Sequence, residues 1–417
     1  MSKKIYDTFI IGGGASGLCT AVRLKQIDCN ISVAVAEQLQ RVGKKLITTG
    51  NGRCNITNKD ISISRFHSEN PQFVQSVIEK YDNSHIESFF ADLGIVITYD
   101  ETGRAYPYSL QASSVVDALR LAADDKGVET LLETKVLSIE KKKGIYEIST
   151  SNGTFSAKTL VVAAGLYSGG IKLGSDGSIY KMMSSLGYKT VKTTPAIVQL
   201  RTIGDIAKSL KGIKVNATVA LLIGGKTVRS DFGEVLFCDY GLSGPAVMQI
   251  SREAERKAGA KTVTLDLMPE YSFSDIVELL KFRASVLKGR KLEDFLSGML
   301  NKRVGQTVLK LIGKKLSDTV DSLNSSDLKK AASVIKGMSF ETVGSRGFEN
   351  SQVTAGGIDT NEFDSGNMMS KRDAGLFAVG EILDVDGDCG GFNLHWAWSS
   401  SLCAAEGIAE YLGLELC

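Results

Sequence analysis

The sequence predicts an α/β fold in which a doubly wound parallel sheet is interrupted by a β-rich insertion and a small helical insertion. Three observations predict this fold. An apolar run, Phe9–Ile11, leads into a glycine-rich turn and then a helical pattern. A second buried run, Thr159–Ala164, also ends at a glycine, and strand–helix alternation returns over residues 352–417. Between them, from about residue 190 to 337, the pattern changes to antiparallel strands and then short helices, so the parallel sheet is expected to be assembled from distant segments.

The first glycine-rich turn reads Gly12-x-Gly14-x-x-Gly17. Gly12 permits a tight turn, Gly14 lets the backbone approach a pyrophosphate, and Gly17 lets the helix pack close to the strand. The next predicted strand, Ile31–Ala36, ends in Glu37, 20 residues after Gly17, where a carboxylate can hold a ribose hydroxyl. The spacing predicts a dinucleotide whose phosphates face the helix N-terminus. A structural strand–helix–strand unit without a ligand is the alternative.

Composition and charge restrict the class of protein. The chain is 43% hydrophobic and 23% charged, which allows a large hydrophobic core. Its net charge of only +2 does not indicate a highly charged partner for the chain as a whole. The seven cysteines form no CxxC pair and the three histidines are scattered, so we expect neither a disulfide framework nor a metal site. No signal peptide and no run of about 18 apolar residues is visible. We therefore expect a cytoplasmic monomer or homodimer that acts on a small molecule, with no membrane span and with nucleic acid ranked lower as a partner.

Residues 38–58 form a long polar loop rich in Gly, Asn, Thr and basic residues. Loops of this length inside a compact fold are usually functional. The run Gly50–Gly52 can turn several backbone amides toward one point, and four cations stand beside the predicted phosphates: Arg41, Lys44, Lys45 and Arg53. A surface loop with solvated lysines is the alternative.

The next segments follow the patterns of regular structure. Helices are expected within 71–95 and over 114–126 and 179–186, and strands over 128–132, 136–141, 146–150 and 154–157. The dipeptide Asn152-Gly153 predicts a hairpin between the last two strands.

The interrupting region predicts two parts. Strands are expected over 191–202, 214–223, 226–230, 234–237 and 263–267, and helices over 273–287, 292–300, 304–312 and 327–336, with Ser326 as the N-cap of the last. Between residues 281 and 336 there are 13 Lys or Arg and 5 Asp or Glu, a net charge of +8 (13 − 5). Such a basic helical lobe can meet an anionic substrate or RNA, or its lysines simply keep small helices soluble.

The last segment begins with a buried strand, Gly375–Gly380, which is followed directly by Glu381. The loop Asp384–Asn393 then leads into a predicted helix, Leu394–Tyr411. Its two glycines, Gly390 and Gly391, allow backbone contact with a flat ligand, and Asn393 is expected to cap the helix, whose N-terminus would face that ligand.

Several longer motifs carry a resemblance to a known family. They are IIGGGASG near the start, GKKLITTGNGRCNITN (43–58), GRAYP (103–107), GLSGPA (241–246), VTAGGID (353–359) and GLFAVGEILDVDGDCGGFNLHWAWSS (375–400). Over essentially its full length the chain resembles the BaiN-like flavoproteins, a family that also contains enzymes described as aminoacetone oxidases.

The resemblance implies non-covalent FAD in a discontinuous Rossmann-like domain. The implied boundaries are 1–190 and 353–417 for the FAD-binding domain, 191–268 with 338–352 for the β-rich insertion, and 269–337 for the helical insertion. Val136 is implied to bond the adenine through its backbone. With the glycine motif, the implied FAD site comprises Gly12, Gly14, Ala15, Ser16, Gly17, Glu37, Lys44, Lys45, Asn51, Gly52, Cys54, Val136, Ala164, Gly165, Gly380, Glu381, Asp384, Gly391, Phe392, Asn393 and Leu394.

The resemblance also implies a reaction: reduction of an activated C=C bond in a bile-acid-like 3-oxo-Δ4 or Δ4,6 steroid. No second GxGxxG is visible, so NAD(P)H is expected to visit the flavin only transiently. Candidate proton donors are Tyr106, Tyr240 and His395, and a packing role is the alternative for each. The chain departs from the family pattern at Cys238-Asp239 and at His395. The identity of the residue that supplies the proton is therefore left open.

Two rival functions remain. One is an oxidase of a small amine such as aminoacetone, reoxidised by O2. The other is an RNA-associated flavoprotein that uses the basic helical lobe.

Overall fold

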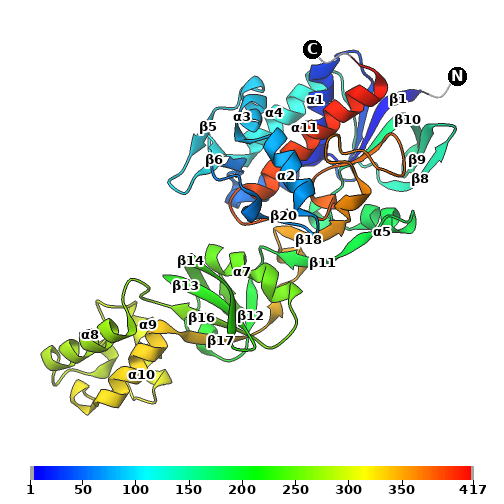
Figure 1. Ribbon diagram of the computed structural model, residues 1–417. Helices are drawn as coiled ribbons and strands as arrows, with labels where there is room; N and C mark the ends of the chain where they lie inside the picture. The colour runs from blue at the N-terminus through cyan, green and yellow to red at the C-terminus, as the bar shows by residue number, and fades with distance from the viewer. Residues whose placement is uncertain (1–3, 415–417) are drawn as a thin grey trace. The chain divides into compact units, whose positions relative to one another are not determined.

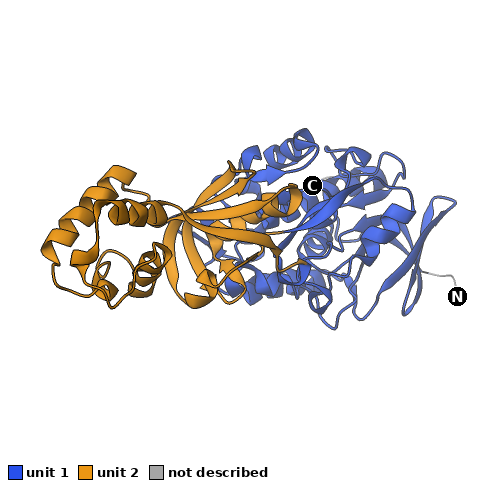
Figure 2. Cartoon of the chain, turned by 90° about the horizontal axis from the view of Figure 1, so that it is seen from below, with its two compact units in different colours: residues 1–195, 348–417 blue, residues 196–347 orange. Residues whose placement is uncertain are grey.

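The computed structural model describes residues 4–414, so residues 1–3 and 415–417, the outermost ends of the predicted FAD-binding domain, lie outside the description. The chain divides into two compact units (Figure 2). Unit 1 comprises residues 1–195 and 348–417, and unit 2 comprises residues 196–347. Each unit has its own hydrophobic core. Within residues 4–414, no helix combines the length and apolar character that crossing a bilayer requires.

Unit 1 is built on a seven-stranded sheet in the order β7-β2-β1-β10-β9-β8, with β19 also paired to β10 (Figure 1). The parallel part consists of β7 (Glu129–Leu131), β2 (Val33–Ala36), β1 (Ile5–Ile11), β10 (Gly153–Val162) and β19 (Leu376–Ala378). β8 (Val136–Lys142) and β9 (Ile145–Thr150) add an antiparallel edge, and the hairpin predicted at Asn152-Gly153 is confirmed between β9 and β10. The predicted α/β class, assembled from distant segments, is therefore confirmed.

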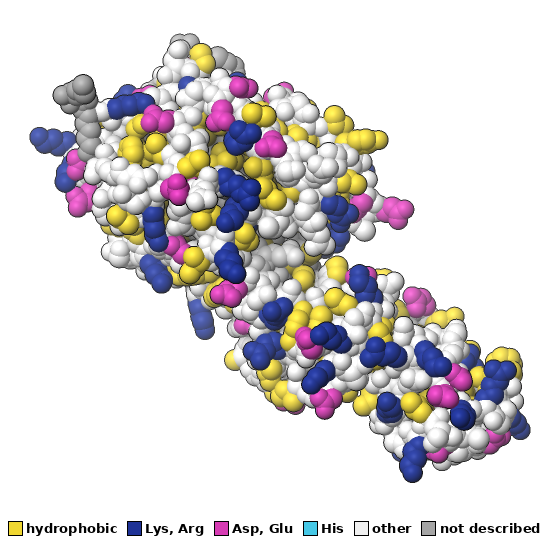
Figure 3. All heavy atoms as spheres, turned by 180° about the vertical axis from the view of Figure 1, so that it is seen from behind, with side chains coloured by type: hydrophobic (Ala, Val, Ile, Leu, Met, Phe, Trp, Pro, Cys, Tyr) yellow, Lys and Arg dark blue, Asp and Glu magenta, His cyan; other side chains and the backbone are white. Residues whose placement is uncertain are grey.

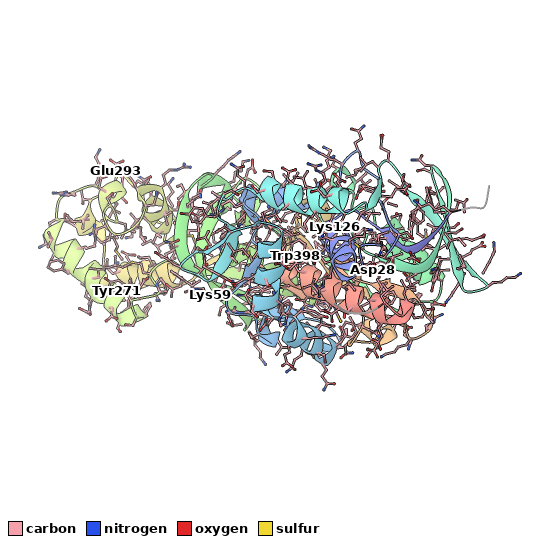
Figure 4. All side chains as sticks on the ribbon, turned by 90° about the horizontal axis from the view of Figure 1, so that it is seen from above. Asp28, Lys59, Lys126, Tyr271, Glu293 and Trp398 are labelled. Atoms are coloured by element: carbon pink, nitrogen blue, oxygen red, sulfur yellow. The ribbon has the colours of Figure 1, made fainter. Side chains whose placement is uncertain are left out.

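Two helices from opposite ends of the chain pack together on this sheet (Figure 1): α1 (Ala15–Ile27) and α11 (Phe392–Leu412). α11 is apolar on nearly all sides, as expected for a helix buried within the protein. Its Trp398, labelled in Figure 4, is completely buried and donates its indole N–H to the Ile56 carbonyl at 3.0 Å. The C-terminal segment is thereby joined to the loop after β2.

The remaining elements of unit 1 surround this core. The helices are α2 (Pro71–Lys80), α3 (Asn83–Asp92), α4 (Ala112–Asp125) and α5 (Ser178–Ser185). Three short strands form one small sheet: β3 (Thr57–Asn58), β6 (Arg104–Pro107) and β5 (Ile97–Tyr99). Two further pairs are β4 (Phe66–His67) with β20 (Asp386–Gly387), and β11 (Thr190–Ala196) with β18 (Val353–Ile358).

Unit 2 contains a closed antiparallel barrel in the order β12-β15-β14-β13-β16-β17. Its strands are β12 (Leu200–Thr202), β15 (Gly241–Ser243), β14 (Lys226–Cys238), β13 (Lys214–Ile223), β16 (Lys261–Asp266) and β17 (Met338–Ser345). Outside the barrel lie α6 (Ile206–Ser209), α7 (Pro245–Arg256), α8 (Phe273–Val286), α9 (Lys302–Leu311) and α10 (Ser325–Lys336). Closure removes the exposed edges that an open sheet would present.

Several predicted boundaries in the insertion were wrong. The break expected between the strands 226–230 and 234–237 is absent among the described residues, because β14 runs unbroken from Lys226 to Cys238. The helix expected over 292–300 is only a 3₁₀ turn, Leu292–Asp294. The N-cap of α10 is Asn324 instead of Ser326, because Asn324 and Asp327 form a reciprocal capping box.

Candidate functional site

The carboxyl ends of four parallel strands meet along one edge of the unit 1 sheet. Gly12, after β1, donates its N–H to the Ala36 carbonyl of β2 at 2.8 Å. Ala163, after β10, bonds the Ile11 carbonyl at 2.9 Å, and Val379, after β19, bonds Val162 at 3.1 Å. Open α/β sheets bind their ligands in the crevice outside such strand ends.

The three glycines of the first turn meet different demands. Gly12 has a φ of 106°, and a Cβ there would lie 2.6 Å from the Ala163 oxygen. A Cβ on Gly17 would lie 1.9 Å from the Gly12 oxygen. A Cβ on Gly14 would meet no heavy atom of the described chain within 4 Å. Packing therefore requires the first and third glycines, whereas Gly14 faces open space, as a backbone approached by a ligand must.

The Glu37 carboxylate is held beside this turn. Its two oxygens accept from the amides of Gly13 at 3.0 Å and Leu39 at 2.9 Å. Burial raises the pKa of this carboxyl, although the backbone donors and the nearby Lys44 oppose the rise. The Thr134 amide donates to the Glu37 carbonyl at 2.8 Å, which brings the segment entering β8 at Val136 next to Glu37.

A polar cluster joins the two sequence segments of unit 1. Lys45 Nζ lies 2.5 Å from Glu381 Oε2 and also donates to the Ser168 hydroxyl, which in turn donates to Glu381 Oε1. The Thr354 amide donates to the same Glu381 oxygen at 3.0 Å. Ser168 and Thr354 were missed in the sequence, where each is only a hydroxyl near a glycine motif. The half-buried Ala164 and the left-handed Gly165 (φ 64°) lead into this cluster.

The neighbouring Gly380 is not an open backbone position. A Cβ there would lie 2.1 Å from the Ser16 hydroxyl oxygen. Its N–H bonds the Ser400 hydroxyl at 3.0 Å, and its carbonyl accepts from Trp396 at 3.1 Å. Gly380 and the buried Ser16 thus join β19, α1 and α11.

The loop around residues 50–54 has an unusual backbone. Gly50, Asn51 and Gly52 are consecutive left-handed residues, with φ of 57°, 56° and 82°. Asn51 and Gly52 are exposed, whereas Cys54 is completely buried. Burial raises the pKa of the Cys54 thiol to about 12, so this sulfur is a neutral thiol at pH 7.

The α11 N-terminus begins at a glycine. Gly391 is the N-cap (φ 101°), and a Cβ there would lie 2.4 Å from the Thr57 oxygen. The prediction that Asn393 caps this helix was wrong, because its side chain instead bonds both the amide and the carbonyl of Gly387 at 2.8 Å. Phe392 and Asp384 are buried and Leu394 is half-buried. Asp384 accepts from the Glu69 amide at 2.8 Å.

Two features of the chain itself fit a bound dinucleotide. α1 and α11 both start at glycines, and neither N-terminus receives a side-chain cap from the described residues. Such ends leave backbone N–H groups and a positive dipole available for an anionic group. Beside the α11 start, the Asn55 side-chain oxygen is buried with no hydrogen-bond partner in residues 4–414. It lies 2.8 Å from where a Cβ of Gly391 would stand, and a buried polar atom of this kind is expected to meet a ligand or water.

The three proton-donor candidates lie in different environments. His395 is completely buried, with Nδ1 2.8 Å from the Thr57 hydroxyl, and burial lowers its pKa to about 3. Tyr106, on β6, is nearly buried and has the Arg53 guanidinium 4.8 Å from its ring centre. Tyr240 lies in unit 2, with Arg346 4.5 Å from its ring centre, and burial raises its pKa. Unit 1 therefore holds two of the three.

The fold is of the Rossmann type, and the family match places the chain among flavoprotein oxidoreductases of this fold. The chain belongs to the family described as "HI0933-like protein Rossmann domain", whose model matches residues 6–407. The resemblance to the BaiN-like flavoproteins is thereby confirmed.

Two kinds of curated relative match nearly the whole chain. The 3-dehydro-bile acid delta(4,6)-reductase of Clostridium scindens is 32% identical over 404 residues, covering 96% of this chain and 98% of that protein. The ribosomal RNA dihydrouridine synthases of Haemophilus influenzae and Escherichia coli are 28% and 27% identical, each covering 97% of this chain and 98% of the relative. Among solved structures, a quinol–fumarate reductase with menaquinol shares the fold, with a TM-score of 0.52 and 16% identity over 99% of this chain and 72% of that one.

Proposed function

We propose that this flavoprotein reduces a C=C bond conjugated to a carbonyl group, with NAD(P)H as the hydride source. The observation that carries the proposal is the pair of glycine-started, uncapped helix N-termini in unit 1, at Gly14 and Gly391. The relatives support the type of bond, since a Δ4,6-reductase and a dihydrouridine synthase each act, by name, on a ring double bond. A 3-oxo-Δ4,6 bile-acid-like steroid is the first substrate to test, because the relative bearing that name is 32% identical.

In this proposal the protein's own residues bind and orient the cofactor. The amides at the start of α1 hold the pyrophosphate, Glu37 accepts a ribose hydroxyl, and the backbone at Val136 meets the adenine. The amides at the start of α11 stabilise negative charge on the flavin ring. Bound FAD supplies hydride transfer. The rest of the predicted site, including Lys44, Asn51 and Gly52, lines the same cofactor in this assignment.

An enone also needs a proton at its α carbon or oxygen. Of the three predicted donors we favour Tyr106, which lies in unit 1 and whose ring contacts the Arg53 guanidinium, while no hydrogen bond of its hydroxyl is found within residues 4–414. His395 is assigned a packing role, because a buried imidazole with a pKa of about 3 is neutral at pH 7 and so lacks the imidazolium form that is the stronger proton donor. Tyr240 is the alternative donor.

The test is anaerobic turnover of the FAD-loaded protein with NADH or NADPH and the 3-oxo-Δ4,6 bile acid. We expect the flavin absorbance to bleach with the nicotinamide and to return as saturated product forms. Tyr106→Phe should lower the product-forming rate at least about 100-fold with FAD still bound. Bleaching without any saturated product, together with peroxide release on aminoacetone in air, would instead support the oxidase.

A second candidate substrate is a uridine in RNA, whose C5=C6 bond is also conjugated to a carbonyl. One feature of this chain favours it: the net charge of +8 over residues 281–336. The two RNA-modifying relatives agree with this candidate. Dihydrouridine formation in RNA mixed with enzyme and NADPH, measured by mass spectrometry of nucleosides, distinguishes it from the steroid.

A further inference from the structure

Charge is divided unequally between the two units. Unit 2 contains 24 Lys or Arg and 16 Asp or Glu, a net charge of +8 (24 − 16). Unit 1 contains 25 and 31, a net charge of −6 (25 − 31). The near-neutral total of +2 therefore hides a basic unit attached to an acidic one. An unequal distribution of this kind produces a local field that attracts a polyanion.

The basic side chains of the helical part of unit 2 fall into two groups. Some are neutralised locally, such as Lys302 by Asp294 at 2.9 Å and Lys314 by Asp327 at 2.6 Å. Seven others are exposed and form no side-chain ion pair or hydrogen bond within residues 4–414. We call them the seven free cations: Lys288, Arg290, Lys291, Lys310, Lys315, Lys329 and Lys330. Figure 3 shows Lys and Arg side chains spread over one face of this unit.

The backbone brings several of these cations together. Lys291 and Thr319 form an antiparallel bridge, and the Val320 amide donates to the Arg290 carbonyl at 2.9 Å. Leu292 bonds the Asp318 carbonyl at 2.8 Å. The segment 288–293, with its three cations, therefore runs beside 316–321, which follows Lys315 and also carries Asp318 and Asp321.

Exposed aromatic side chains accompany these cations. Phe282 on α8 is 66% exposed, and Tyr271 and Phe273 at the start of α8 are 46% and 45% exposed. Tyr271 lies at the surface of this helical region in Figure 4. Aromatic rings interspersed with cations are typical of surfaces that stack unpaired bases while tracking a phosphate backbone. An acidic protein partner could use the same cations, and the binding test below distinguishes it from RNA.

We propose that residues 269–337 form an RNA-binding surface, on which the seven free cations contact phosphates and Phe282 stacks on an unpaired base. The proposal rests on the second candidate function, reduction of a uridine in RNA. It assigns the helical part of unit 2 the task of holding structured RNA, separately from the chemistry of unit 1.

The test measures binding by the full-length, FAD-loaded protein. The probe is a fluorescein-labelled hairpin RNA of about 30 nucleotides with an unpaired loop, followed by anisotropy over a KCl series. Each neutralised phosphate contributes about 0.7 to 0.9 to the slope of log K against log salt. The triple variant Lys288→Gln, Arg290→Gln, Lys291→Gln should bind at least about tenfold more weakly, with a slope reduced by about 2. Phe282→Ala should weaken binding about tenfold with the slope unchanged.

A matched control removes three cations from unit 1: Lys126→Gln, Lys181→Gln and Lys189→Gln. These are also exposed and unpaired within the described residues, so this variant should bind RNA as the wild type does. Absence of binding, an equal loss in both triple variants, or preference for an acidic peptide over RNA would overturn the proposal. NADPH bleaching of the flavin is followed in parallel, so that RNA binding without turnover, or turnover without RNA binding, identifies which of the two proposals has failed.

Discussion

Two helices of unit 1 begin differently from the three helices of the helical insertion in unit 2. In unit 1, α1 and α11 start at Gly14 and Gly391 with no side-chain cap from the described residues. In unit 2, α8, α9 and α10 are each capped by a side chain, from Ser272, Asn301 and Asn324. A capped helix start has satisfied its own donors, whereas an uncapped start at a crevice keeps them for a ligand. The same contrast exists within unit 1, where α2 and α3 are capped by the side chains of Asn70 and Asp82, so the uncapped starts of α1 and α11 are a property of individual helices and not of the whole unit.

The largest effect is expected in the barrel core. Phe237 is completely buried and packs against Phe340, with ring centres 6.0 Å apart. Phe237→Ala should destabilise unit 2 by about 4 kcal/mol. Because the two cores are separate clusters, the flavin absorbance should persist while residues 196–347 become accessible to protease. Loss of flavin at the same temperature as the proteolytic opening would show that the units do not unfold separately.

Next comes the distinction between two glycines of one turn. Gly14→Ala introduces a Cβ into open space, so the apo protein should melt at the same temperature as the wild type. FAD should nevertheless bind about 100-fold more weakly, because the methyl group blocks the approach of the backbone to the pyrophosphate. Gly17→Ala should instead unfold the apo protein, because its Cβ would lie 1.9 Å from the Gly12 oxygen. Thermal melts and FAD titration by fluorescence measure both. Unchanged FAD affinity in Gly14→Ala would place the phosphates elsewhere.

A smaller effect is expected where charge joins the two segments of unit 1. Glu381→Gln keeps the shape but removes the carboxylate that Lys45, Ser168 and the Thr354 amide share. We expect the free energy of unfolding of the apo protein to fall by about 1.5 kcal/mol in urea. The control is Glu140→Gln, which breaks an exposed ion pair with Lys142 and should change stability by less than about 0.5 kcal/mol. Equal effects of the two changes would refute a special role for the cluster.

The smallest effect concerns pH and compares one cap in each unit. Asp82 caps α3, and hydrogen bonds, first from the Ser84 hydroxyl, lower its pKa from 3.8 to about 2. Because the folded pKa lies below the unfolded one, the stabilisation is present above about pH 4 and is lost as the pH falls toward 2.

Asp82→Ala should therefore cost about 1 kcal/mol at pH 7 and less at pH 3, as seen in melting temperatures. Asn301→Ala, which removes a cap with no titrating group, should cost the same at both pH values. A pH-independent gap for Asp82→Ala would contradict this assignment.

Much of unit 1 could be predicted because its signals are local. An apolar strand, three spaced glycines and a carboxylate at the next strand end lie within residues 9–37, so the turn and the position of Glu37 followed from spacing. The contacts of Ser168 and Thr354 could not be predicted, because β10, β18 and β19 bring them to Lys45 only after folding.

The starts of α10 and α11 were each misjudged by two residues. At α10, Asn324 is preferred to Ser326 because Asp327 completes a capping box. At α11, a left-handed glycine occupies the N-cap, which leaves the Asn393 side chain to hold the loop at Gly387. His395 shows a different limit. Its burial depends on Thr57 and Phe66, which are distant in sequence.

The pairing of β11 with β18 has a consequence for the history of the gene. The strand by which the chain leaves unit 1 and the strand by which it returns are hydrogen-bonded neighbours. The residues between these two strands can be lengthened, shortened or exchanged by recombination at one place, without changing the strand order of the unit 1 sheet. Unit 1 and unit 2 can therefore diverge independently within a single polypeptide.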